Sequence, residues 1–182
     1  LGVLFYFSKT PRFIPEPIIK AKIFSIIILT ILLPILLFFL LKTINKVQSI
    51  HLKSTKERVI PLFINCIIVV LIILRVLTSA EIIKLYYFFL GILCSTLTCL
   101  ILALFKVKAS IHMIGAAGFF MFAVALSIHY KININGTISL MMIILGGIAT
   151  SRLHLKAHTN QELLLGTLVG LFPQLIFVNY WL

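Results

Sequence analysis

A short polar stretch near the C-terminal end of the chain contains the residues best suited to chemistry. Within residues 151–162, Arg152 is followed six positions later by His158 and then, four positions further, by the carboxylate of Glu162. An arginine can hold a phosphate group through two parallel hydrogen bonds, and a neutral histidine can attack phosphorus. Long apolar segments precede and follow this stretch, so its charged groups predict an anion-binding site rather than a solvated surface.

The composition predicts that the chain lies in a membrane. Of its 182 residues, 62% are hydrophobic and 11% are charged, and the mean hydropathy is +1.21. A soluble domain of this length could not bury so much apolar surface. The apolar runs are continuous rather than alternating, which excludes a transmembrane β-barrel. We therefore expect an all-α fold, a polytopic membrane helical bundle.

Six segments are long and apolar enough to be transmembrane helices, and together they predict one domain over residues 1–182. The segments are residues 23–41, 61–78, 85–105, 113–128, 137–150 and 163–182. Residues 1–8 are expected to be the remnant of a further apolar helix, and the three prolines in residues 9–20 predict an interfacial loop. Pro34 predicts a kink in the first span. Two glycine pairs predict close helix packing, Gly115 with Gly118 and Gly146 with Gly147.

Three polar loops are predicted to emerge on the same side of the membrane. Each span reverses the side, and the loops at residues 42–60, 105–112 and 151–161 follow the first, third and fifth spans. Five side chains in or beside these loops could therefore converge on one site: Arg58, Lys108, His112, Arg152 and His158. Phosphoryl transfer depends mainly on positioning and charge stabilisation, so three cations and two histidines could perform it without a metal.

The charge balance indicates the kind of partner. The chain has 16 basic residues and four acidic ones, for a formal net charge of +12. One interpretation is that lysines and arginines at the helix ends contact lipid headgroups, and the other is an anionic ligand. No soluble basic domain is present to bind nucleic acid. The scarcity of carboxylates also argues against a Mg²⁺ or two-metal mechanism.

The polar stretch resembles the third motif of the PAP2 (type 2 phosphatidic acid phosphatase) superfamily, SR-x5-H-x3-D. Ser151 and Arg152 match its beginning, His158 matches its histidine, and Glu162 stands where the family has an aspartate. The resemblance extends over roughly residues 50–170, and the three motifs follow one another in the family's order.

Two further motifs support this resemblance. Residues 108–112, Lys-Ala-Ser-Ile-His, are similar to the second motif, PSGH, with Ile111 in place of the glycine. Residues 57–61, Glu-Arg-Val-Ile-Pro, are similar to the end of the first motif, K-x6-RP. His51 occupies the position of the lysine in that motif, and Lys53 and Lys56 are the two candidates to replace it. More narrowly, the pattern resembles compact PAP2-like membrane proteins of Bacteroidetes, which includes a glycine, here Gly166, eight residues after the histidine.

The resemblance implies a role for each member of the cluster. His158 would be the nucleophile that forms a phosphohistidine, Glu162 would orient it, and His112 would be the general acid. The phosphoryl oxygens would be held by Arg58, Lys108 and Arg152, with added hydrogen bonds from Ser110 and Ser151. No metal or other cofactor is implied.

Glu162 also has a purely structural interpretation. Residues 159–162, Thr-Asn-Gln-Glu, fit a capping box, so the glutamate could simply cap the last helix. Both roles are compatible only if that helix extends back to His158, because residues four apart share a helical face.

The expected function is therefore an integral membrane phosphatase acting on a lipid phosphate or lipid pyrophosphate. The resemblance implies a bacterial inner membrane, with the active site facing the periplasm. The excess of lysine and arginine in the three polar loops would instead favour the cytoplasm, but the balance is nearly even once the charges of the proposed phosphate clamp are set aside. Glycerolipid phosphates, undecaprenyl pyrophosphate and lipid A phosphates all remain candidate substrates. The alternative is a catalytically inactive PAP2-like protein that binds lipid phosphates, or a small membrane transporter or scaffold.

Overall fold

The structure is a computed structural model that describes residues 1–10, 14–44, 55–77 and 82–182. These residues form helices and irregular turns, without a strand among them. The helices are α1 (Gly2–Lys9), α2 (Glu16–Ile27), α3 (Leu33–Thr43), α4 (Thr55–Leu71), α5 (Ile83–Leu104), α6 (Ile111–Tyr130), α7 (Asn135–His154) and α8 (Asn160–Val178). Two π-helical turns, η1 (Ile28–Leu32) and η2 (Ile72–Val76), continue α2 into α3 and extend α4.

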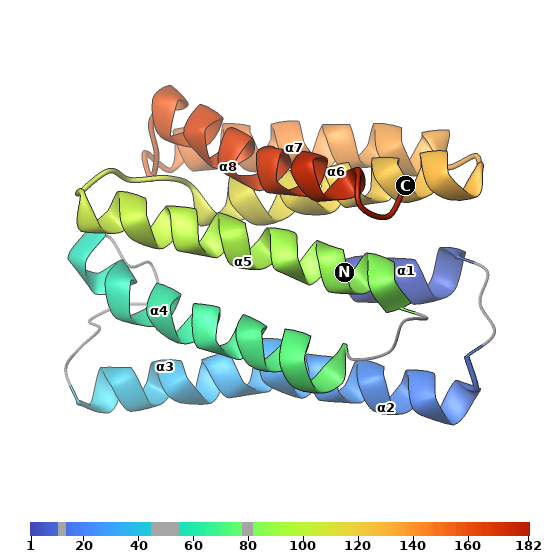
Figure 1. The fold of residues 1–182 in the computed structure, drawn as a ribbon. Helices are drawn as coiled ribbons and strands as arrows, with labels where there is room; N and C mark the ends of the chain where they lie inside the picture. The colour runs from blue at the N-terminus through green and yellow to red at the C-terminus, as the bar shows by residue number, and fades with distance from the viewer. Residues whose placement is uncertain (11–13, 45–54, 78–81) are drawn as a thin grey trace.

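Six of the described helical segments are long and apolar enough to cross a membrane, so the chain is an integral membrane protein. The first span is the rod formed by α2, η1 and α3, the second is α4 with η2, and the remaining four are α5 to α8. Figure 1 shows the helices side by side. The ends of α3, α5 and α7 lie at the same end of the bundle as the beginnings of α4, α6 and α8. The predicted helical bundle is confirmed, and the helix ends that flank the three polar loops lie at one end of it (Figure 1).

Some predicted boundaries were wrong by about one to two helical turns. Residues 16–20 were expected in the proline-rich loop, but α2 begins at Glu16. Pro17 lies in the first turn of that helix, where the missing N–H would have had no partner in any case. The fifth span extends past residue 150 to His154, so Arg152 is on a helix rather than in a loop. The last span begins at Asn160 and ends at Val178 rather than at residue 182.

A wide helical turn accompanies the proline of the first span. Pro34 lies just after η1, in the first turn of α3. A proline ring clashes with the carbonyl four residues earlier, here that of Thr30, and it cannot donate a hydrogen bond. A π-helical turn absorbs both effects by locally widening the helix. The chain thus passes this proline without breaking the span.

Glycines allow α8 to approach α6 at backbone distance. A β-carbon at Gly170 would collide with the backbone carbonyl of Ile114, and one at Gly118 would lie 3.3 Å from the carbonyl oxygen of Gly170. In membranes such small residues permit the close packing that replaces the hydrophobic effect between helices. The prediction was wrong for Gly115, which has no neighbouring atom within 4 Å of where a β-carbon would stand, and for both members of the second pair, Gly146 and Gly147, which have none either. That second pair lies on α7, which packs mainly on α6 and leaves most of its surface exposed.

Two buried polar side chains join α5 to α8 inside the bundle. The side-chain amide of Gln174 donates to the carbonyl of Phe88 at 3.0 Å, and the hydroxyl of Ser95 donates to the carbonyl of Val169 at 2.9 Å. Gly91 makes room for the first bond, since a β-carbon there would collide with the amide of Gln174. In a bilayer each such bond contributes roughly 0.6 to 2 kcal/mol. They fix the height of α8 relative to α5.

The main apolar core lies in the half of the bundle away from the polar loops. It joins Tyr6 of α1, Phe88 of α5, Phe122 of α6 and Trp181 after α8. The rings of Phe88 and Phe122 stack at 4.1 Å, and Trp181 meets Phe122 edge-on at 6.0 Å. Close packing here leaves the opposite end, where the polar loops meet, as the place where side chains can face a ligand.

Three helices end in the same turn, with a lysine in the left-handed conformation. In α5 the N–H of Val107 donates to the carbonyl of Leu102 and the N–H of Lys106 donates to that of Ala103, at 2.8 and 3.1 Å. This is the Schellman arrangement, in which glycine usually takes the left-handed position. That position is held here by Lys106 (φ 62°), Lys131 (φ 52°) and Lys156 (φ 48°). A cation at a helix C-terminus is favourable by about 0.3–1 kcal/mol, which offsets part of the backbone strain.

Replacement of Gly170 by alanine should destabilise the bundle. We expect Gly170→Ala to lower the free energy of unfolding by about 1–3 kcal/mol, because the added methyl group overpacks α8 against α6. Gly147→Ala is the matched control, since its methyl group meets no neighbour and alanine favours a helix by up to about 1 kcal/mol. Thermal unfolding of both variants in detergent measures the difference. Equal melting temperatures would contradict the proposed close contact.

Candidate active site

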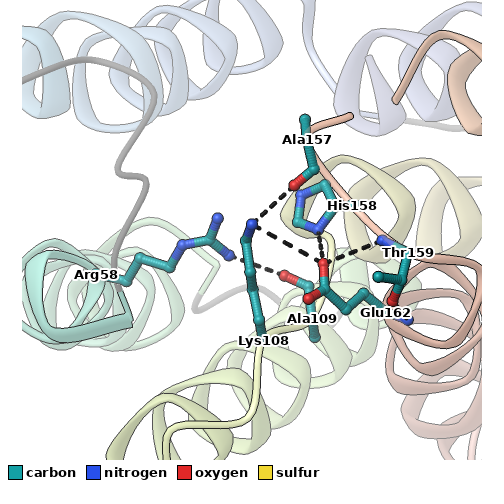
Figure 2. A network of polar contacts seen from close by, with 7 residues as sticks. All are labelled: Arg58, Lys108, Ala109, Ala157, His158, Thr159 and Glu162. Atoms are coloured by element: carbon teal, nitrogen blue, oxygen red, sulfur yellow. Dashed lines mark hydrogen bonds and ion pairs between the residues drawn. The ribbon is translucent and has the colours of Figure 1, made fainter. Parts of the chain in front are cut away.

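The candidate site is built around the first turn of α8. Thr159 is the N-cap residue, and its hydroxyl accepts a hydrogen bond from the N–H of Glu162 at 3.3 Å. The Glu162 carboxylate oxygen Oε2 accepts in return from the N–H of Thr159 at 3.4 Å. This reciprocal pair is a capping box, as the sequence predicted. It fixes the Glu162 side chain beside the residue that precedes the cap, His158 (Figure 2).

The same carboxylate oxygen also holds the His158 ring. Nδ1 of His158 lies 2.7 Å from Oε2 of Glu162. An ionised carboxylate can only accept, so Nδ1 carries the proton and Nε2 keeps its lone pair. Both roles considered for Glu162 are therefore present at once. The expectation that the helix had to reach back to His158 was wrong, because His158 lies outside α8 and the carboxylate bends toward it from the first turn.

Burial lowers the pKa of His158. Desolvation of the ring is the largest cause and the charges of Lys108 and Arg58 act in the same direction, whereas the hydrogen bond and the charge of Glu162 raise the pKa. The side chain is only 6% exposed. The net shift is downward, so the ring is neutral at pH 7 and Nε2 is available as a nucleophile. His158 binds a proton more readily in the unfolded chain than in the folded protein. Protonation of this residue therefore lowers the free energy of unfolding as the pH falls below about 6.5.

Lys108 connects the turn before α6 to the turn before α8. Its ammonium nitrogen donates to the carbonyl of Ala157 at 2.7 Å and lies 3.9 Å from Oε2 of Glu162. Figure 2 shows the lysine extending from its own loop to both partners. The side chain is about a quarter exposed. Lys108 therefore places a positive charge beside His158 while part of it still faces outward.

Arg58 reaches the cluster from the first turn of α4. One terminal nitrogen of its guanidinium group, Nη1, donates to the carbonyl of Ala109 at 3.0 Å (Figure 2). The residue is 6% exposed, which is unusual for an arginine. A buried guanidinium group must be held by hydrogen bonds to be tolerated. The bond to Ala109 ties α4 to the turn before α6.

His112 and Arg152 complete the charged part of the site. His112 lies on the first turn of α6, is exposed, and is close enough to Arg152, His158 and Arg58 for their charges to act on it. Arg152 lies on the last turn of α7 and is partly buried. Its Nε atom is fully buried and has no hydrogen-bond partner among the described residues. A buried N–H of a cation without a partner is a donor to which an anion could bind.

The two predicted serines differ in position. Ser110 is the N-cap residue of α6 and is fully buried; its N–H donates to the carbonyl of Glu162 at 3.2 Å. Its hydroxyl has no partner in the part of the chain that the structure describes. Ser151 is exposed on α7 beside Arg152, and no contact with the cluster is seen among the described residues. The geometry thus brings Ser110 to the cluster and leaves Ser151 at its edge.

Gly166 explains how Ser110 and α8 can be so close. A β-carbon at Gly166 would stand 2.7 Å from the carbonyl oxygen of Ser110 and 3.1 Å from its nitrogen. Any larger residue would push α8 away from the turn before α6 and separate Glu162 from Lys108. The glycine eight residues after His158 thus has a physical function in this chain.

Sequence reasoning missed the hydrogen-bond acceptors of Arg58 and Lys108. The carbonyls of Ala109 and Ala157 accept from Arg58 and Lys108, and no side chain marks a backbone acceptor in a sequence. Of the candidates for the first-motif lysine, Lys53 lies outside the described residues, as does His51. Lys56 is exposed on α4 and has no contact with the cluster among the described residues. Those residues also include no group of three histidine, cysteine or acidic side chains that could hold a metal ion.

Comparison of the chain with models of protein families, with curated proteins and with solved structures found no match. The functional interpretation therefore depends on the residues and the geometry described above.

Replacement of Glu162 by glutamine should lower the pKa of the His158 ring and leave helix α8 intact. Glutamine retains the capping box, but it removes the charge that raises the pKa of His158. We expect the wild-type pKa to lie below the ordinary value of 6.5 and that of Glu162→Gln to lie lower still. Nuclear magnetic resonance of ¹⁵N-histidine-labelled protein in detergent micelles measures both values. A higher pKa in the variant, with helix content unchanged by circular dichroism, would contradict the assigned contact.

Proposed function

We propose that this protein is a membrane-embedded phosphatase that hydrolyses a lipid phosphate or lipid pyrophosphate through a phosphohistidine at His158. The observation that carries the proposal is the 2.7 Å contact between Nδ1 of His158 and Glu162, which leaves Nε2 unprotonated in a cluster of three cations. An oriented, neutral imidazole beside cations that can hold phosphoryl oxygens is an arrangement suited to nucleophilic attack on phosphorus. The resemblance to PAP2 motifs supports the same assignment.

The reaction would proceed in two balanced steps. Nε2 of His158 attacks phosphorus and forms a P–N bond, while the P–O bond to the lipid alcohol or lipid phosphate breaks. The departing oxygen takes a proton from His112. Water then attacks the phosphohistidine and gives a proton back to His112, and inorganic phosphate leaves as His158 is restored. Neither step consumes a co-reactant other than water.

The cations have distinct parts in this proposal. The buried Nε of Arg152 has an unused N–H, and Lys108 is partly exposed beside His158, so both could contact phosphoryl oxygens directly. Arg58 is buried and positions the turn before α6, because its guanidinium group donates to the carbonyl of Ala109 in that turn. A bound phosphate group would also bring negative charge next to His112, which favours the protonated ring that a general acid needs.

The membrane location of the site indicates an amphiphilic substrate. The residues of the cluster lie on or beside the ends of α5 and α7 and the beginnings of α4, α6 and α8, which meet at one end of the bundle (Figure 1). In a bilayer, the ends of membrane-spanning helices lie near the headgroup region. A phosphate headgroup there would have its hydrocarbon part among the helices. We assign the protein to a bacterial inner membrane, with the site on the periplasmic side, because the resemblance favours that side.

Loss of the His158 side chain should abolish phosphate release. Purified wild-type protein is expected to release phosphate from a short-chain phosphatidic acid in detergent with EDTA present, and His158→Ala should reduce the rate by at least about a thousandfold. His154→Ala is the matched control, because His154 is exposed four residues earlier and should leave the rate unchanged. If neither the wild type nor His158→Ala released phosphate from any of several lipid phosphates, the result would contradict the enzyme assignment and favour a binding protein.

The proposed orientation can be tested with two exposed lysines in equivalent turns. Lys156 lies at the site end of the bundle and Lys131 at the opposite end, and both have the left-handed conformation. In intact cells we expect a membrane-impermeant maleimide that passes the outer membrane to label Lys156→Cys, and to label Lys131→Cys only after the inner membrane is permeabilised. The native cysteines are replaced first. The reverse labelling pattern would place the site in the cytoplasm.

A further inference from the structure

A narrow groove between α3 and α4 opens close to the candidate site. Its volume is about 80 Å³. Each helix contributes four residues at positions i, i+3, i+4 and i+7, from Pro34 to Leu41 on α3 and from Pro61 to Ile68 on α4. This spacing places one face of each helix toward the other. Seven of the eight residues are apolar, so the groove suits a hydrocarbon chain.

The groove exists because the first span is attached mainly at its other end. There α2 packs against η2, and the ammonium group of Lys22 donates to the carbonyl of Val76 at 2.6 Å. Along the groove, α3 and α4 have hardly any close backbone contact. The two helices are thus joined away from the site and separated next to it.

One end of the groove lies near the charged cluster along α4. Pro61 follows Arg58 by three residues on α4, which is a rise of about 4.5 Å along the helix. Leu41 lies two residues before the end of α3, at the same end of the bundle (Figure 1). From there to Pro34 and Ile68 the groove extends about 10 Å toward the membrane centre. A lipid whose phosphate lay at the cluster could therefore place one chain in the groove.

One polar residue inside the groove needs a partner. Asn65 is partly buried on α4, and its side-chain amide has no hydrogen bond with any described residue. An amide in the hydrocarbon region is unfavourable unless it is hydrogen-bonded. The matching group on a lipid would be an ester, amide or hydroxyl group near the top of the chain.

We propose that this groove binds one hydrocarbon chain of the phosphate-bearing substrate, and that Asn65 recognises a polar linkage on that chain. The inference rests on the proposed phosphatase function and narrows its substrates to acyl-linked lipid phosphates. A prenyl phosphate, whose chain has no hydrogen-bonding group, would leave Asn65 without a partner. Asn65 is thus a specificity-determining residue, separate from the residues that contact the phosphate.

The first test blocks the groove. Ile64→Trp should lower kcat/KM for a diacyl phosphatidic acid by at least about tenfold, because the indole ring displaces several methylene groups of the chain. It should leave the hydrolysis of a water-soluble phosphate monoester, such as p-nitrophenyl phosphate, unchanged. Ile67→Trp is the matched control on the lipid-facing side of the same helix and should change neither rate. An unchanged lipid rate in Ile64→Trp, or an equal loss on both substrates, would overturn the groove assignment.

The second test concerns the amide. Asn65→Leu should lower kcat/KM for the diacyl lipid by about fivefold, the effect of one lost hydrogen bond, and should not lower that for farnesyl phosphate. Equal effects on the two lipids would refute a recognition role for Asn65.

A binding readout separates failure of the groove from failure of the phosphatase proposal. A phosphatidic acid with a diazirine in its acyl chain is photo-crosslinked to wild-type protein and to His158→Ala, and the labelled peptides are mapped. We expect labels on α3 and α4 in both proteins, and weaker labelling with the corresponding diacylglycerol, which lacks the phosphate. If wild type releases no phosphate but this pattern appears, the phosphatase proposal fails and the groove proposal stands. Labelling elsewhere, or equal labelling by diacylglycerol, overturns the groove proposal even when the enzyme is active.

Discussion

The close approach of α8 to α6 is the constraint on which the candidate site depends. Gly166 and Gly170 allow the backbone of α8 to touch that of α6 and of the preceding turn. This contact lets the N–H of Ser110 donate to the carbonyl of Glu162, which places the first turn of α8 beside Lys108. The close packing at the two glycines thus sets the relative positions of the helix cap, His158 and Lys108. Packing between helices, rather than any charged contact, sets the geometry of the polar groups.

The charged groups are held in a way that preserves their positive field. Arg58 and Lys108 donate hydrogen bonds to backbone carbonyls of neighbouring turns, and the carboxylate of Glu162 lies 3.9 Å from the ammonium group of Lys108. A carbonyl satisfies the donor without cancelling its charge, whereas a carboxylate would neutralise it. With four acidic residues among 182, the chain has few carboxylates that could pair with these cations. The low acid content therefore also suits the proposed binding of a phosphate group.

The sequence predicted the bundle and the members of the cluster better than their contacts. Six apolar runs and their alternation across the membrane were enough to bring Arg58, Lys108 and His158 to one end. Helix boundaries were less accurate, because Pro17 is as acceptable in a first turn as in a loop. The pair Gly146–Gly147 was misjudged, since a sequence does not say which face of a helix meets a neighbour.

The dual role of Glu162 needed three dimensions to be seen. From the spacing of residues alone, capping the helix and contacting the histidine are alternative roles for the Glu162 carboxylate. In the structure Oε2 of Glu162 serves both His158 and Thr159, because the residue before the cap folds back over the first turn. The carbonyl acceptors of Arg58 and Lys108 are likewise invisible in sequence, where every residue has the same backbone.

The three lysines in left-handed turns also bear on how the chain can vary. Lys106, Lys131 and Lys156 recur at equal intervals, so each unit of helix and turn between them uses the same length of chain. The turn at Lys156 also directs the carbonyl of Ala157 toward Lys108. One residue inserted into α7 would rotate everything after it by ~100° about the helix axis and move Arg152 away from the cluster. The number of residues between these lysines is therefore constrained, as well as their types. Insertions should be tolerated better near the ends of the chain than between Lys106 and Lys156.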